Sequence, residues 1–206
     1  MTIKSMARST ITNSVRYQDF LAGNPTYVPP SFNSIATATG TGASATITFS
    51  SIPSTYKHLQ LRWIAKDTFG PGFAGVYQIS LQFNSDSGSN YAGHRLLNDS
   101  TTVNAYGQAN QTTIPNILGI TPTATYLNNI MGVGIIDIHD YSSTTKYKTL
   151  RSFSGGDTNS STVGQTGIVS LSSGLWQNTN AITSISISAA ITAFTTTTQF
   201  ALYGIK

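Results

Sequence analysis

A period-two alternation of apolar and polar residues, broken by a polar loop, constrains the fold of this chain most strongly. In the segment VYQISLQF, residues 76–83, every second residue is apolar, as in a strand with one buried face. Residues 84–90, NSDSGSN, favour a turn because such side chains bond their own backbone or tolerate positive φ. Residues 91–97 are extended and rich in apolar side chains again. This stretch predicts an antiparallel hairpin of two strands around a polar loop.

Further strands follow at regular spacing from residue 41 onward. Leu59, Leu61 and Trp63 share one face of a strand over 58–65, and we expect them to pack with Ile79 and Leu81 on facing or adjacent strands. The segment 130–138, IMGVGIIDI, is apolar on both faces and predicts a central strand. The segment 147–153 predicts a strand with its Lys and Arg facing outward. Shorter runs predict strands at 45–49, 101–106, 168–171, 185–189 and 200–205.

The composition supports an all-β class. Only 9% of the residues are charged and Glu is absent, whereas about 25% of the residues of an average soluble domain are charged. Ser, Thr, Asn and Gly suit short strands joined by turns. We therefore predict an all-β fold, an antiparallel two-sheet β-sandwich of jelly-roll-like topology; a closed barrel is the alternative.

Residues 1–40 show no sustained period and predict an extended N-terminal arm before a sandwich domain at 41–206. Asn24-Pro25 and Pro29-Pro30 remove backbone donors and force their neighbours into extended conformations. The arm cannot bury its own apolar groups, so we expect it to dock on other proteins; the alternative is that it folds back on its own sandwich. The predicted docking residues are Arg16, Tyr17, Phe20, Leu21, Tyr27 and Phe32.

Several classes of function receive no support from the sequence. The chain has no cysteine, so disulfides and Cys-ligated metals are excluded. We expect no membrane insertion and no Sec export, because neither a secretory apolar region nor a spanning apolar run is present. The net charge of +4 is thinly spread, with only Lys146, Lys148 and Arg151 clustered. We therefore do not expect nucleic-acid binding.

The candidate chemistry centres on the sequence IDIHD. Asp137 and His139 lie on one strand face beside Asp140, which would suit a metal or an acid–base pair. We favour the alternative of a polar strand end entering a turn. Asp137 with Asp140 is also the chief candidate pair for glycoside hydrolysis. No nucleophile elbow is present. We expect no enzyme activity, no metal and no cofactor.

The polar loop after residue 83 is a candidate ligand site. Its oxygen and amide groups beside an aromatic ring would suit a host surface glycan. The alternative, which we favour, is that these side chains stabilise the turn. The candidate ligand-binding residues are Asn84, Asp86, Ser87, Asn90 and Tyr91.

Four motifs in order carry a family resemblance: SIPSTYKHLQLR at 51–62, FNSDSGSNY at 83–91, SSGLWQ at 172–177 and FALYGIK at 200–206. Together they resemble a β-sandwich domain of tailed-bacteriophage virion proteins, often described as tail fibre or tail proteins and frequent in phages of marine bacteria and cyanobacteria. The resemblance covers roughly Ala43 to Lys206. The segment RYQDFLAGNPTY at 16–27 is similar to segments that precede such domains.

The resemblance implies a location in a virion, either head or tail, after synthesis in the host cytoplasm. We expect a structural protein, docked by its arm on other virion proteins, whose sandwich forms part of a tail fibre or other appendage. A homo-oligomer is expected, with a trimer as the first guess. The alternatives are a receptor or glycan-recognition module for host attachment at a fibre tip, and a capsid decoration protein.

Overall fold

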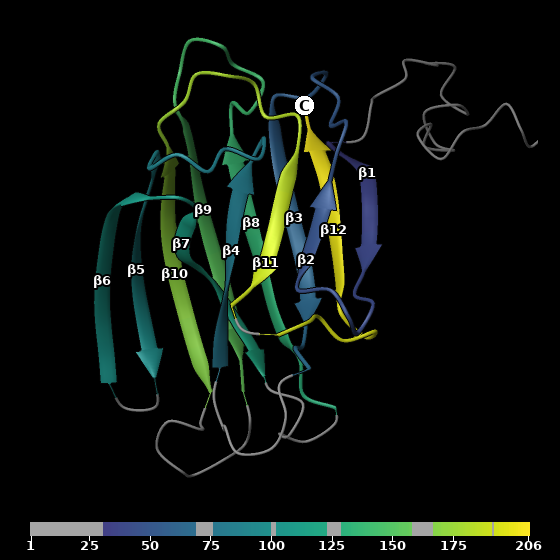
Figure 1. The fold of residues 1–206 in the computed structure, drawn as a ribbon, viewed down its shortest axis with the longest axis vertical. Coiled ribbons are helices and arrows are strands. Elements are labelled where there is room, and N and C mark those ends of the chain that lie inside the picture. The colour runs from purple at the N-terminus through teal and green to yellow at the C-terminus, as the bar shows by residue number, and fades with distance from the viewer. Residues whose placement is uncertain (1–30, 69–75, 100–101, 123–128, 158–166, 191) are drawn as a thin grey trace, which may run out of the picture. The chain divides into compact units, whose positions relative to one another are not determined.

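In the computed structural model, the chain folds into two β-sheets that lie one over the other (Figure 1). The structure describes residues 31–68, 76–99, 102–122, 129–157, 167–190 and 192–206. Within these residues the strands are β1 Phe32–Thr39, β2 Thr46–Phe49, β3 His58–Ala65, β4 Val76–Phe83, β5 Tyr91–Asp99, β6 Thr102–Gln111, β7 Ile114–Pro122, β8 Gly132–His139, β9 Lys148–Gly156, β10 Ile168–Trp176, β11 Ile185–Ala189 and β12 Gln199–Ile205.

Among the described residues, the larger sheet has eight strands in the order β1-β12-β3-β8-β9-β10-β5-β6, and the smaller has four in the order β2-β11-β4-β7. The strand pairs with an assigned register are antiparallel. The predicted all-β, antiparallel two-sheet sandwich is confirmed.

Eight of the strands follow jelly-roll topology. Taken in chain order they are β1, β2, β3, β4, β7, β8, β11 and β12. The first pairs with the last, the second with the next to last, and so inward: β1 with β12, β2 with β11, β3 with β8 and β4 with β7. A long antiparallel ribbon rolled into two sheets has this order.

The remaining four strands are two insertions that widen the larger sheet. Strands β5 and β6 come between β4 and β7, and β9 and β10 come between β8 and β11. They add to the sheet beyond β8 in the order β9-β10-β5-β6. Strand β7 of the smaller sheet packs over β9, β10 and β5.

The core lies between the two sheets. Leu59, Leu61 and Trp63 on β3 are buried, as are Ile79 and Leu81 on β4, which confirms their prediction as core residues on facing strands. Where the Trp63 ring crosses the neighbouring strand, a Cβ on Gly134 would come within 2.0 Å of it. Gly134 thus leaves the space that the indole fills.

The predicted hairpin around residues 84–90 is wrong in its pairing. Strand β4 belongs to the smaller sheet and β5 to the larger, so the loop crosses between the layers. Strand β4 pairs with β11 and β7, while β5 pairs with β10 and β6. Alternation identified both segments as strands, but it carries no information about which strand each one pairs with.

The sandwich also begins before residue 40. Strand β1 is a member of the larger sheet, and Ile35, Ala36 and Ala38 pack against the core. The compact unit spans Ser34–Lys206. The sequence of β1, FNSIATAT, consists mostly of small residues, so its apolar alternation is too weak to predict a strand. Phe32 begins β1, with 44% of its surface exposed; the other predicted arm residues, Arg16, Tyr17, Phe20, Leu21 and Tyr27, lie outside the described part of the chain.

Candidate functional site

The loop between β4 and β5 brings the predicted ligand-binding residues together, and most of their polar groups bond within the protein. Tyr91 is buried; its hydroxyl accepts from the Phe83 amide at 3.0 Å and donates to the Phe83 carbonyl at 3.2 Å. Burial raises the pKa of Tyr91 to about 12. Ser87 is exposed.

Asp86 lies at the centre of this loop. Its Oδ2 accepts from the indole Nε1 of Trp176 at 2.8 Å, and its Oδ1 accepts from the amide of Gly88 at 2.9 Å. Asn90 Nδ2 donates to the same carboxylate. The bond from Trp176, with those from Gly88 and Asn90, lowers the pKa of Asp86 even though partial burial acts in the opposite direction. The carboxylate is therefore an internal acceptor.

Asn84 fixes the start of the loop. It adopts a left-handed conformation, φ 51°, which Asn tolerates better than most residues. Its Oδ1 accepts from the amides of Thr183 and Ser184 at 2.8 and 3.1 Å, and its Nδ2 donates to the Ala181 carbonyl at 2.8 Å. These contacts join the end of β4 to the segment that leads into β11.

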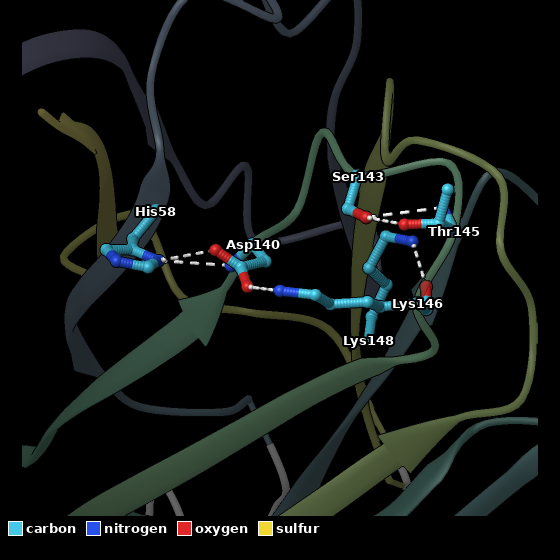
Figure 2. Close-up of polar contacts among 6 residues, drawn as sticks. All are labelled: His58, Asp140, Ser143, Thr145, Lys146 and Lys148. Atoms are coloured by element: carbon cyan, nitrogen blue, oxygen red, sulfur yellow. Dashed lines mark hydrogen bonds and ion pairs between the residues drawn. The ribbon is translucent and has the colours of Figure 1, made fainter.

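The second predicted cluster lies where β8 ends, and Figure 2 shows part of it. Asp140 accepts from Lys146 Nζ at 2.8 Å, while its own amide donates to His58 Nδ1 at 3.0 Å. Because Nδ1 accepts that N–H, His58 is neutral in this arrangement. Burial, with a smaller effect of His139, lowers the pKa of His58. The rings of His58 and His139 pack edge to face, with their centroids 5.2 Å apart.

Asp137, the other carboxylate of this cluster, is also held by neighbouring side chains. It accepts from Gln60 Nε2 at 2.8 Å and from Arg151 Nε at 3.0 Å. Asp137 and Asp140, the candidate pair for glycoside hydrolysis, thus each have a cationic partner. Among the described residues, no group of three or more His, Cys, Asp or Glu side chains could hold a metal ion.

Lys148 corrects one sequence-based expectation, because it points inward rather than outward. It is 1% exposed, and its ammonium donates to the carbonyls of Lys146 at 2.8 Å and Thr179 at 3.1 Å (Figure 2 shows the first bond). Burial lowers the pKa of this ammonium. Lys148 and Arg151 are three residues apart on one strand and therefore occupy opposite faces of the sheet.

The outer face of the larger sheet, which is turned away from the core, carries a pattern of exposed side chains that none of the candidate sites above includes. Directly opposed residues of antiparallel strands share a face, and the register aligns four apolar residues across β8, β9, β10 and β5. This apolar row consists of Ile135, Phe153, Leu171 and Leu96. The last three are each more than half exposed.

Two further rows lie on either side of the apolar row. On one side is a row with the exposed apolar residues Ile64, Val133, Val169 and Val103. On the other side is a polar row of Gln60, Asp137, Arg151, Ser173 and His94. Arg62 Nε also donates to Gln60 Oε1 at 2.7 Å, so a hydrogen-bonded network connects Arg62, Gln60, Asp137 and Arg151.

The outer face is hollowed into shallow grooves. One groove of about 820 Å³ lies over β9, β10, β5 and β6, and a second of about 390 Å³ lies over β3, β8, β9 and β10. Leu96 and Leu171 line the first, with Arg151, His94 and Ser173 along its polar side. Val133, Phe153 and Val169 line the second. Apolar walls with a few placed polar groups are typical of binding surfaces.

The sequence contains a signal for this face. The segment 130–138 is apolar at odd and even positions, which predicts a strand covered on both sides. The structure covers the face that carries Ile136 and Ile138 and leaves Val133 half exposed. This strand thus has one face in the core and an apolar residue exposed on the other face.

Comparison with protein-family models, with curated proteins and with solved structures finds no match to this chain. Within the part of the chain that the structure describes, no helix has the length and apolarity to cross a membrane.

Proposed function

We propose that this chain is a structural protein of a tailed-phage virion, in which the sandwich is an assembly module of a tail fibre or other appendage and the residues before β1 dock it on neighbouring virion proteins. The observation that carries the proposal is the outer face of the larger sheet. Its apolar residues lie contiguously across several strands, and such patches on soluble proteins usually mark contact surfaces.

The state of the polar clusters supports a structural role over a chemical one. Asp86, Asp137 and Asp140 each accept bonds from neighbouring side chains, and Asn84 bonds to backbone groups across the sandwich. A general acid or nucleophile needs a group directed at a substrate. Here these groups stabilise loops and strand ends, as an assembly module requires.

Arm docking is tested with a chain that begins at Ser31 and so keeps β1. We expect it to fold like the full chain but to be absent from particles assembled without the full-length protein, as measured by quantitative mass spectrometry of purified virions. Full-length protein supplied in the same way is the matched control. Incorporation of the shortened chain at the normal level would place the docking site on the sandwich.

A receptor-recognition module is the second candidate, and the groove beside Arg151 and His94 favours it. Its volume of about 820 Å³ lies within the range of small-ligand sites, and its residues combine an apolar floor with donor groups. A module of this kind would bind a host saccharide as an isolated protein. Retention on immobilised host polysaccharide, lost in Arg151→Ala, would support this candidate.

A further inference from the structure

We propose that the outer face of the larger sheet is a self-association surface, where two copies of this chain pack face to face around a twofold axis. The axis runs parallel to the strands, between β9 and β10. Three observations carry this inference: the exposed apolar area, the symmetry of the side-chain pattern, and the placement of the charges. The biological meaning of such a dimer rests on the proposed assembly role, but its existence is independent of the virion assignment.

The available area is sufficient for a specific dimer. The patterned face extends over six neighbouring strands from β3 to β6, and strands about 4.8 Å apart with three rows about 6.7 Å apart give roughly 600 Å² per copy. Two copies would therefore cover roughly 1,200 Å², above the about 1,000 Å² expected of a biological interface.

The side chains are arranged nearly symmetrically about the line between β9 and β10. A twofold axis there sets β9 opposite β10, β8 opposite β5 and β3 opposite β6 of the second copy. Phe153 then faces Leu171, and Ile135 faces Leu96, so the apolar row meets itself. In the adjacent row, Ile64 faces Val103. Aligned sheets cross at about 30°, so these pairings hold best near the axis.

The same axis leaves no like charges opposed among the described residues of the three rows. Asp137 faces the His94 imidazole of the second copy, Arg151 faces Ser173, and Arg62 faces Ala105. Moving the axis by one strand is unfavourable. An axis between β8 and β9 would place Arg62 opposite Leu171 of the second copy. An axis between β10 and β5 would leave Ile135 with no strand of the second copy opposite it.

The primary test is the mass of the full chain in solution, measured by sedimentation over a wide range of concentrations. We expect a reversible two-copy species, weakened at least tenfold by Leu171→Asp, because a carboxylate would be buried against Phe153 of the second copy. Thr48→Asp places the same charge on the exposed side of β2 in the smaller sheet and serves as the matched control. Phe153→Ser is a second variant in case Leu171→Asp does not fold, and the thermal unfolding of each variant is compared with that of the wild type.

Cross-linking tests the geometry, since the chain has no cysteine of its own. Sheets pack about 10 Å apart, which is too far for a disulfide, so a short bifunctional thiol reagent is used. Phe153→Cys and Leu171→Cys chains, separately or mixed, should cross-link between copies because the axis passes between these two positions, whereas Thr48→Cys chains alone should not.

Three sedimentation results would overturn the inference. They are a monomer at all concentrations, a dimer that Leu171→Asp and Phe153→Ser leave unchanged, and a three-copy species. Saccharide binding by a monomer, abolished by Arg151→Ala, would also overturn it and would assign the face to recognition. Failure of the Ser31 truncation experiment would affect only the docking role of the N-terminal residues.

Discussion

The indole of Trp176 on β10 donates a 2.8 Å hydrogen bond to the carboxylate of Asp86 in the loop that follows β4. This bond joins two of the sequence motifs, FNSDSGSNY and SSGLWQ, which are about 90 residues apart. Trp176 also stacks on Tyr91, its cross-strand neighbour, at a centroid distance of 6.3 Å. The loop is thereby anchored to the larger sheet as it leaves the smaller one.

Removing the donor should destabilise the fold. Trp176→Phe keeps an aromatic ring but loses the bond to a charged acceptor, and we expect unfolding free energy to fall by about 2–4 kcal/mol. Urea unfolding at pH 7 measures the loss. In a double-mutant cycle with Asp86→Asn, the two effects should be clearly non-additive; simple additivity would show that the bond contributes nothing.

The lowered pKa of Asp86 predicts a pH dependence of definite sign. Its folded pKa lies below the unfolded value of 3.8, so its stabilising contribution is complete well above pH 4 and is lost as the pH falls through the folded pKa. Asp86→Asn should therefore be less stable than the wild type at pH 7, with a difference that shrinks toward pH 2. Chemical unfolding across this range checks the prediction, and a difference that grows on acidification would contradict it.

Asn84 should contribute to the stability of the fold through both its backbone conformation and its side-chain hydrogen bonds. Asn84→Ala loses the bonds to Thr183, Ser184 and Ala181 and places at φ 51° a residue that adopts the left-handed region less readily than Asn. We expect a loss of roughly 2–4 kcal/mol. Asn84→Gly tolerates the backbone but also loses the bonds, so it should be less destabilised. Equal melting temperatures for the two variants would rule out a backbone contribution.

Gly134 is predicted to be intolerant of a side chain. A methyl group there would meet the Trp63 ring at 2.0 Å and force a buried indole to move, at a cost of roughly 1–3 kcal/mol or more. Gly155→Ala on the neighbouring strand is the control, because its nearest neighbours lie at 3.4 and 3.9 Å. Thermal unfolding should separate the two variants, and equal stability would show that the core around Trp63 adapts freely.

Strand β1 should be needed for stability although it lies at a sheet edge. A chain beginning at Thr41 loses Ile35 and Ala38 from the core and exposes the edge of β12. We expect a lower melting temperature and aggregation, because an uncovered edge strand is a template for pairing. The chain beginning at Ser31 is the control and should melt like the full chain. Identical behaviour of the two would place β1 outside the cooperative unit.

Local chemistry predicted most of the strands, but neither β1 nor β7, and it did not predict which strands pair. Alternation located Leu59, Leu61 and Ile79 in the core because a buried face imposes a period of two on any strand. It could not predict that β10 pairs with β5, or that residues 84–90 cross between layers, because pairing depends on contacts distant in sequence. The inward direction of Lys148 was missed because charge alone suggested exposure. The apolar row was missed because its members come from four separate strands.

Cryo-electron microscopy of purified phage particles tests the central claim most directly. The account predicts density for the two-sheet sandwich in an appendage, with the outer face of the larger sheet, around Phe153 and Leu171, covered by protein. Particles that lack this sandwich, or that contain it with the outer face open to solvent, would contradict the account.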